Sequence, residues 1–329
     1  MSSSRSCPNN AQRLVAGEQR VSVIIPTQNR PALLRAAVDS VLGQTRPVDQ
    51  IVVIDDGSDL PEWLPTLASL SPTIEVVRRE RPGGASAARN AGLDRVRGDY
   101  LLFLDDDDLI DPHFVEQGLA VLAQNPRAGG VFFRYRTITW TEPGGGSHRL
   151  AEGKTSSPLP FKVAVGENPV PRATLEQHPI TAFLRYRIPI CAGFLRCSTV
   201  GAIRFSEILR QGEDTHFWIS LAAAGHRFVL DERVCAIVRR HAENTTRSRA
   251  RYMSEIQTCY ETLLAAPLLP GADDVFLAHL KLLCFKMLTG GTDRSRHLRH
   301  VLASPRRLAA EADFWTRNLS GRFVRAWFQ

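Results

Sequence analysis

Short apolar runs alternate with amphipathic segments along the chain from Val21 to Thr139. Four of the runs are rich in β-branched or bulky apolar residues and are too short for helices, which predicts strands at residues 21–25, 51–54, 74–77 and 100–104. Between them, apolar positions recur at helical spacing and predict helices at residues 31–42, 85–96 and 112–122. Strands that alternate with helices imply right-handed crossovers. The predicted fold class is therefore α/β, with three layers (α/β/α) around a mostly parallel sheet.

The second half of the chain is less regular. Between residues 141 and 172 it is rich in Pro, Gly and Ser, and a long loop of this kind is often a lid or an insertion. Regular signals then predict helices at residues 175–185 and 213–224, and strands at 190–195, 228–230 and 234–238. After Arg247 the chain is predicted to be mostly helical. We therefore expect a flexible lead at residues 1–20, one domain at 21–246 and a C-terminal helical extension at 247–329.

Composition and charge narrow the class of protein. A hydrophobic fraction of 43% and a mean hydropathy of −0.15 are ordinary for a globular domain. No stretch reaches the roughly 18 apolar residues that a membrane span requires, and the polar residues 1–20 predict no signal peptide. Six cysteines follow no disulfide or metal-ligand spacing, which favours a cytoplasmic location. The net charge of +7 suits anionic partners, but no nucleic-acid-binding signature accompanies it, so we expect no nucleic-acid partner.

The run Asp105–Asp108 is the strongest sign of chemistry in the chain. It directly follows the apolar run Tyr100–Leu104, so four carboxylates are expected at the end of a buried strand. Carboxylates this close repel one another, and hard oxygen ligands suit Mg²⁺ or Mn²⁺ together with substrate phosphates. A solvated acidic turn is the alternative. The place at the carboxyl end of a strand, where open α/β sheets bind ligands, favours a metal and phosphate site.

Six motifs carry a resemblance to a known family. They are the segments Val21–Arg30, Ile54–Ser58, Gly83–Asn90, Leu104–Asp108, Gly212–Trp218 and Arg239–Thr245. In order and approximate spacing they resemble glycosyltransferase family 2, a group of inverting, nucleotide-sugar-dependent enzymes with the Rossmann-like GT-A fold. The resemblance covers residues 21–246 and implies a nucleotide-sugar-binding half at 21–140 and an acceptor half at 141–246. The region from 247 to 329 lies outside it.

The resemblance implies a donor site at the ends of the first strands. Contacts with the nucleotide sugar are expected from Pro26, Thr27, Asn29, Arg30, Asp56, Gly84, Arg89, Asp105 and Asp106. Asp56 is expected to accept the imide N–H of a uracil or thymine ring, which favours a UDP- or dTDP-linked donor. The segment Asp55–Ser58 is also rich in turn formers, so an ordinary turn stays open. Arg89 is expected either to contact the diphosphate or to pair with Asp94 or another acid.

The acidic run itself resembles the family's Asp-X-Asp motif, and the following Pro112 sets its register at Asp105 and Asp107. The resemblance then makes Asp107 the ligand of Mn²⁺ or Mg²⁺. It gives Asp105 a contact with the ribose, or with the metal through water. Asp106 and Asp108 are expected to be secondary, and Asp108 to cap the next helix.

Three further roles follow from the resemblance. His241 lies where many members place a third metal ligand, although a single His is more often structural. Glu213 and Asp214 open a helix where the family places its catalytic base, and acids at a helix N-terminus are also favoured by the helix dipole. Inverting transfer requires a carboxylate that deprotonates the acceptor hydroxyl. We expect Asp214 to be that base, because it lies four residues before Trp218, and Glu213 to orient the acceptor.

The predicted function is the inverting transfer of a sugar from a nucleotide-diphosphate sugar to an acceptor hydroxyl, in glycan or glycoconjugate biosynthesis. A sugar nucleotidyltransferase is the alternative enzyme, but residues 26–30 lack the Gly-rich, basic loop that it requires. A non-catalytic sugar-nucleotide-binding module is disfavoured by the presence of both Asp107 and Asp214. The acceptor is not identified, and the segment 141–190 is expected to select it.

The C-terminal region combines arginine clusters with aromatic residues. Helices that pack on the first domain and a homodimer contact are two expectations for it. A third is a peripheral contact with anionic membrane, at the inner face, through Arg294, Arg296 and Arg299. The aromatic positions of this expectation are Phe314, Trp315, Phe323, Trp327 and Phe328.

Overall fold

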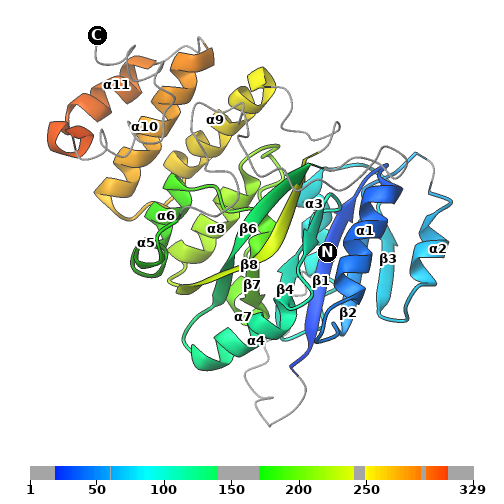
Figure 1. Cartoon of the computed structure of the whole chain (residues 1–329). Coiled ribbons are helices and arrows are strands. Elements are labelled where there is room, and N and C mark those ends of the chain that lie inside the picture. The colour runs from blue at the N-terminus through cyan, green and yellow to red at the C-terminus, as the bar shows by residue number, and fades with distance from the viewer. Residues whose placement is uncertain (1–18, 60, 140–169, 241–248, 290–293, 310–329) are drawn as a thin grey trace.

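The computed structural model describes residues 19–59, 61–139, 170–240, 249–289 and 294–309. Within these residues, one eight-stranded sheet runs in the order β3-β2-β1-β4-β7-β6-β8-β5 (Figure 1). Its strands are β1 (Val21–Thr27), β2 (Gln50–Asp55), β3 (Ile74–Arg78), β4 (Tyr100–Phe103), β5 (Asp108–Ile110), β6 (Gly130–Thr139), β7 (Gly193–Arg196) and β8 (Phe228–Arg240). Four strand pairs are parallel and three, β4–β7, β6–β7 and β5–β8, are antiparallel. The prediction of a mostly parallel sheet is confirmed.

The helices of the first 240 residues follow the predicted periodicity closely. In this part the structure has α1 (Pro31–Leu42), α2 (Leu64–Ala68), α3 (Ala85–Leu93), α4 (Phe114–Gln124), α5 (Arg172–Gln177), α6 (Pro179–Arg185), α7 (Cys197–Val200) and α8 (Glu213–Ala223). The starts of α1, α3, α4 and α8 lie within two residues of the predicted ones. Each of these four helices buries the apolar side of its sequence, as the spacing predicts.

Alternate residues of β7 face two different helical layers. Phe194 packs against Phe114 of α4, with ring centroids 6.2 Å apart. At the neighbouring Gly193, an added Cβ would lie only 2.8 Å from the indole of Trp218 in α8. Because successive strand residues point to opposite faces of a sheet, α4 and α8 cover opposite faces. The predicted three-layer arrangement is therefore confirmed.

Several element boundaries differ from the predicted ones. The helix expected at residues 175–185 is broken at His178, because the residue before a proline, here Pro179, avoids helical backbone angles. The strand expected at 190–195 begins as a 3₁₀ turn over Ile190–Ala192 and becomes β7 only at Gly193. The two strands expected at 228–230 and 234–238 are one strand, β8, whose register against β6 shifts next to Arg134. Strands β5 and β6 and helices α2 and α7 were not predicted.

Asp108 does not cap the next helix, which corrects the expectation from the sequence. It is the first residue of β5 and pairs with Val238 of β8, whereas α4 begins only at Phe114. The turn before α4 is held instead by Asp111, whose Oδ1 accepts the backbone N–H of His113 at 3.1 Å. The pairing of β5 with β8 therefore commits Asp108 to the sheet edge.

The C-terminal helices α9 (Arg249–Ala265), α10 (Ala272–Thr289) and α11 (Arg294–Leu302) gather at one end of the molecule, opposite β3 and α2 (Figure 1). Helix α10 lies against α6, where Thr181 Oγ1 donates to Asp274 Oδ1 at 2.7 Å and Lys281 Nζ donates to the Arg185 carbonyl at 3.4 Å. These contacts agree with the packing role expected for this region. In the part of the chain that the structure describes, no helix has the length and apolarity to span a membrane.

Helix α9 also closes tightly over the start of α8. Gly212, the residue before α8, has a φ of 79°. A Cβ added there would lie 2.6 Å from Ile256 Cδ1 and 2.9 Å from Cys259 Sγ of α9. The Cys259 thiol donates to the Gly212 carbonyl at 3.3 Å. Only glycine combines this backbone conformation with this close approach.

We predict that Gly212→Ala destabilises the protein more than Gly225→Ala. Both glycines have positive φ, but an added Cβ at Gly225 (φ 88°) meets nothing within 4 Å. The backbone strain of about 1–2 kcal/mol is therefore shared, whereas overpacking adds roughly 1–3 kcal/mol at Gly212 alone. Urea unfolding of the two variants measures the difference. Equal losses of unfolding free energy would show that α9 does not pack closely on Gly212.

Candidate functional site

Three neighbouring strands bring their carboxyl ends to one edge of the sheet. The register pairs Thr27 of β1 with Asp55 of β2, and Ile24 of β1 with Phe103 of β4. The acidic turn, residues Asp105–Asp108, is separated from the end of β4 by one residue and so lies beside the end of β1. Open α/β sheets bind ligands at this edge.

Three carboxylates of the acidic turn converge. One oxygen from each of Asp105, Asp107 and Asp108 lies within 4.8 Å of the other two. Among the described residues, this is the only group of three or more His, Cys, Asp or Glu side chains that meets so closely. The side chains of Asp105 and Asp107 are partly exposed, at 29% and 16%, whereas Asp108 is buried. The group can therefore be reached from solvent on one side.

Asp106 faces the interior instead. Its Oδ2 accepts the Thr27 hydroxyl at 2.8 Å, and its Oδ1 accepts Arg30 Nη1 at 3.1 Å. The same Arg30 nitrogen reaches Asp107 Oδ2 at 3.2 Å. Burial and the neighbouring Asp107 charge raise the pKa of Asp106 to about 7, although Arg30 and Thr27 oppose the shift. Thr27 and Arg30 thus hold the acidic turn against the end of β1.

Arg239, at the end of β8, forms hydrogen bonds with the backbone of the acidic turn. Its side chain is fully buried, and it donates to the carbonyls of Asp107 (2.6 Å), Asp106 (2.8 Å) and Leu33 (2.8 Å). Its backbone N–H also donates to Asp108 Oδ1 at 3.1 Å. Burial lowers the pKa of the Arg239 guanidinium, and the three neighbouring carboxylates oppose this. Arg239 opens the last of the six motifs, but the sequence predicted no role for it.

Asp108 has one further contact, with a buried cysteine. Cys191 Sγ donates to Asp108 Oδ2 at 3.2 Å. Burial and the neighbouring Asp107 and Asp105 charges raise the pKa of Asp108 well above its usual value. Burial, together with the Asp108 charge, also raises the pKa of the Cys191 thiol. The thiol is therefore a hydrogen-bond donor here.

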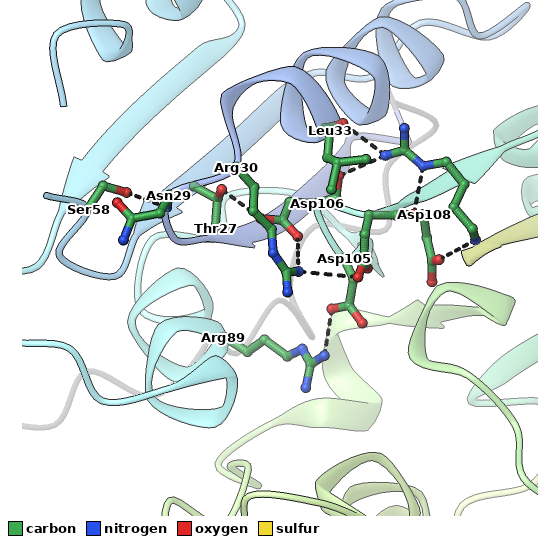
Figure 2. A network of polar contacts seen from close by, with 11 residues as sticks. Thr27, Asn29, Arg30, Leu33, Ser58, Arg89, Asp105, Asp106 and Asp108 are labelled. Atoms are coloured by element: carbon green, nitrogen blue, oxygen red, sulfur yellow. Dashed lines mark hydrogen bonds and ion pairs between the residues drawn. The ribbon is translucent and has the colours of Figure 1, made fainter. Parts of the chain in front are cut away.

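Arg89 of α3 joins the acidic turn to the start of α8. Its Nη2 lies 2.6 Å from Asp105 Oδ1, and its Nη1 lies 3.3 Å from Glu213 Oε1 and 3.2 Å from Asp214 Oδ1. Figure 2 shows Arg30 and Arg89 approaching the acidic turn from different elements. Burial alone would lower the pKa of Arg89, but the three carboxylates reverse this and raise it above its usual value. Of the two predicted roles, the structure shows pairing with acids, although not with Asp94.

Asp214 lies in the first turn of α8 and is electrostatically unusual. Burial, together with the charges of Glu213 and Asp105, raises its pKa to about 7. The positive charges of Arg89 and Arg187 oppose the shift. A carboxyl group whose pKa lies near neutrality can both accept and release a proton, which is the property of a general base.

Asp56 anchors a glycine loop rather than facing open space. Its carboxylate accepts the backbone N–H groups of Gly83 (3.0 Å) and Gly84 (2.6 Å), and it also contacts Arg79. Gly84 precedes α3 and has a φ of 84°. Asp56 therefore fixes the start of the helix that carries Arg89.

The remaining predicted site residues are placed as follows. Pro26 is a buried residue of β1. Asn29, at φ 58°, exchanges hydrogen bonds of 2.8 Å with Asp59, and its backbone N–H donates to Ser58 Oγ at 2.8 Å. It thus links the loops after β1 and β2. His241 lies outside the described residues.

The donor set of the acidic turn fits a hard divalent cation. It offers only carboxylate oxygens, and the mutual repulsion of these charges is what a cation relieves. Arg30, 3.2 Å from Asp107 Oδ2, lies beside the group and neutralises part of its charge. The residues that would hold Mg²⁺ or Mn²⁺ are Asp105, Asp107 and Asp108.

The comparison with protein families decides the affiliation. The model described as "Glycosyl transferase family 2" matches residues 22–198, more than half of the chain. The chain belongs to this family. The matched segment of this glycosyltransferase includes β1 from its second residue, the acidic turn and Arg89, and it ends before Glu213 and Asp214.

Relatives and solved structures extend the comparison. An uncharacterized glycosyltransferase of Haemophilus influenzae is 37% identical over 112 residues, which cover 34% of this chain and 37% of the relative. The glycosyltransferase thus spans little more than a third of that relative's length. The fold of this chain resembles that of TarS of S. aureus in complex with UDP-GlcNAc, with a TM-score of 0.58 and 19% identity. The match covers 90% of this chain and 80% of TarS.

A second solved structure has the same fold. The mannosyltransferase PcManGT from Pyrobaculum calidifontis, in complex with GDP-Man and Mn²⁺, matches with a TM-score of 0.56 and 18% identity. The match covers 91% of this chain and 76% of that chain. The fold of the family 2 glycosyltransferase is therefore of the GT-A, Rossmann-like type, as expected.

We predict that Arg89→Gln destabilises the glycosyltransferase markedly. The change leaves three acids without their shared cation. Because those acids are partly exposed, the loss should lie between the roughly 1 kcal/mol of a surface pair and the roughly 3–5 kcal/mol of a fully buried one. The matched control is Arg95→Gln, which removes a half-exposed pair with Glu75 at 3.0 Å. Thermal unfolding compares them, and similar melting temperatures would contradict a central role for Arg89.

Proposed function

We propose that this glycosyltransferase transfers a sugar from a nucleotide-diphosphate sugar to an acceptor hydroxyl with inversion at the anomeric carbon. The observation that carries the proposal is the guanidinium of Arg89, which holds a candidate cation site and a candidate base on its two sides. Nη2 contacts Asp105 of the acidic turn, and Nη1 contacts Asp214. Inverting transfer needs the leaving group and the base to act on one carbon atom, and this arrangement supports that requirement.

The donor's diphosphate would lie at the acidic turn. Asp105, Asp107 and Asp108 offer the carboxylate oxygens for Mn²⁺ or Mg²⁺. When bound, such a cation supplies a Lewis acid that stabilises charge on the departing diphosphate. Mn²⁺ and GDP-Man occur together in the structurally similar mannosyltransferase, which supports this assignment. His241 stays a predicted third ligand.

Asp214 is the proposed general base. The acceptor hydroxyl oxygen forms a bond to the anomeric carbon as the carbon–oxygen bond to the diphosphate breaks, and the hydroxyl proton passes to an oxygen of Asp214. The bonding electrons leave with the nucleoside diphosphate, so no covalent enzyme intermediate is needed. Arg89 keeps the Asp214 carboxylate oriented. Glu213, which shares the same guanidinium nitrogen, is proposed to orient the acceptor.

The nucleotide preference remains a proposal for UDP or dTDP. A carboxylate offers about four acceptor positions, and Asp56 already receives Gly83, Gly84 and Arg79. A uracil imide would therefore have to take the one remaining position or displace Arg79, the only side chain among these donors. Contacts from Pro26, Thr27 and Asn29 to the base stay predictions, as do a homodimer and a peripheral contact with anionic membrane.

We predict that Asp107→Asn abolishes most metal-dependent nucleotide binding. Replacing one carboxylate by an amide removes a charged ligand from the group of three. Isothermal titration with UDP, in Mn²⁺ and in chelator, measures the metal-dependent part of the affinity. Asp108→Asn should have a smaller effect, because Asp108 is buried and already accepts two hydrogen bonds. Asp94→Asn, which alters an exposed acid paired with Arg204, is the control. If the affinity for UDP is the same with Mn²⁺, with chelator and in Asp107→Asn, the acidic turn is not the metal site.

We predict that Asp214→Asn lowers turnover by roughly 10²–10⁴-fold, the usual contribution of a general base, with donor affinity nearly unchanged. In the unaltered enzyme, turnover should rise with pH through about 7. Burial raises the Asp214 pKa to that value, so the group is protonated and inactive below it. The matched control is Glu213→Gln in the same helical turn. If Glu213→Gln rather than Asp214→Asn removes turnover, the assignment of the two acids is reversed.

A further inference from the structure

The C-terminal helices line a half-open cavity of about 440 Å³. This volume lies within the range of small-molecule sites in proteins, roughly 300–1,000 Å³. Side chains of α9, α10 and α11 and of the turn between α9 and α10 line it. No residue of the acidic turn or of α8 is among them, so the cavity is separate from the candidate donor site.

The lining of the cavity has two kinds of chemistry. Seven of the eleven lining residues are apolar by type, although polar atoms form more of the accessible wall than apolar atoms, and the seven are Leu263, Leu264, Ala265, Ala266, Leu269, Val275 and Leu282. The others include two buried histidines, His279 and His297, and the exposed Arg296. Glu261 also lines the cavity, but its carboxylate pairs with Lys286 Nζ at 2.8 Å. The polar part is therefore basic.

The histidines are held closely together. The Nδ1 atoms of His279 and His297 lie 2.8 Å apart, so the N–H of one ring donates a hydrogen bond to the nitrogen of the other. The ring of His300 stacks on His279 with centroids 4.0 Å apart. Burial, with positive charge on His300, His297 and Arg296, lowers the pKa of His279 to about 4. An anion placed beside these groups would relieve that positive potential.

A metal ion is a poorer occupant than an anion. Within the described residues, only the acidic turn brings three His, Cys, Asp or Glu ligand atoms close enough to share an ion. The short contact also engages both Nδ1 atoms in one hydrogen bond, which leaves only the Nε2 atoms of this pair for a metal. The histidine cluster and Arg296 therefore provide hydrogen-bond donors rather than a ligand set.

We propose that this cavity binds an anionic amphiphile, with its phosphate or carboxylate head at Arg296 and the histidine pair and its apolar chain along the leucines. Such a ligand matches both halves of the lining. A charge-assisted bond from a guanidinium to the head would fix its orientation, and burial of the chain would supply the hydrophobic part of the affinity. Helix α9 lines the cavity and also packs on Gly212. The ligand would therefore contact a helix that itself contacts the start of α8.

Isothermal titration of the full chain with dodecyl phosphate, below its micelle concentration, tests the proposal. Dodecyl maltoside supplies the same chain with a neutral head, and inorganic phosphate supplies the head alone. We expect dodecyl phosphate to bind at least about tenfold more tightly than either. Arg296→Gln should weaken it by about tenfold, the loss expected for a hydrogen bond to a charged group. The matched control, Arg299→Gln, alters an exposed arginine of the same helix that does not line the cavity and should change nothing.

Vesicles containing phosphatidylglycerol distinguish a free amphiphile from a lipid surface. We expect soluble dodecyl phosphate to bind to the chain in the absence of vesicles. We also expect Arg296→Gln to remove its competition with vesicles. Vesicle binding that depends on Arg299 and not on Arg296, without binding of the soluble amphiphile, would overturn the cavity and identify the outer face of α11 as a membrane contact. Equal binding of dodecyl phosphate and dodecyl maltoside would also overturn it, because the head group would then make no contribution.

Discussion

The mutual repulsion of carboxylates at one sheet edge is the constraint on which the rest of the site depends. Two like charges about 4 Å apart repel by roughly 4 kcal/mol at an effective dielectric constant of 20, and the acidic turn concentrates four Asp residues. Three arginines from distant parts of the chain offset this repulsion. Arg30 follows β1, Arg89 lies in α3 and Arg239 ends β8. Each contacts a different side of the turn, so the fold positions the positive charges before any ligand arrives.

These arginines also explain why the acidic turn has its particular shape. Arg239 binds the backbone carbonyls of Asp106 and Asp107 rather than their carboxylates, which leaves the side chain of Asp107 directed elsewhere. Arg30 contacts Asp106 and Asp107, while Asp108 also accepts backbone and thiol donors. The four acids are therefore chemically different despite their identical side chains. Two of them, Asp105 and Asp107, stay partly exposed for a ligand.

The sequence predicted those features that depend on local patterns. The buried strands that lead to Thr27, Asp56 and Asp105 were predicted correctly, because continuous apolar runs are typical of parallel strands covered on both faces. Contacts between distant segments were not predictable in the same way. Nothing in the neighbourhood of Arg89 indicates that it pairs with Glu213 and Asp214, more than 120 positions away along the chain. The pairing of β5 with β8 escaped prediction for the same reason, since three residues carry no periodicity.

The C-terminal helix α9 contacts the start of α8, which carries the proposed base. The proposed base lies in the first turn of α8, and the direction of that turn depends on the backbone at Gly212. Helix α9 fills the space around Gly212 and leaves no room for a side chain there. A shift of α9 would therefore move Asp214 relative to Arg89, because Gly212, which precedes α8, packs directly against α9. The helices that lie outside the family match thus help to set the geometry of residues at the candidate site, and a ligand in their cavity would act on that geometry through α9.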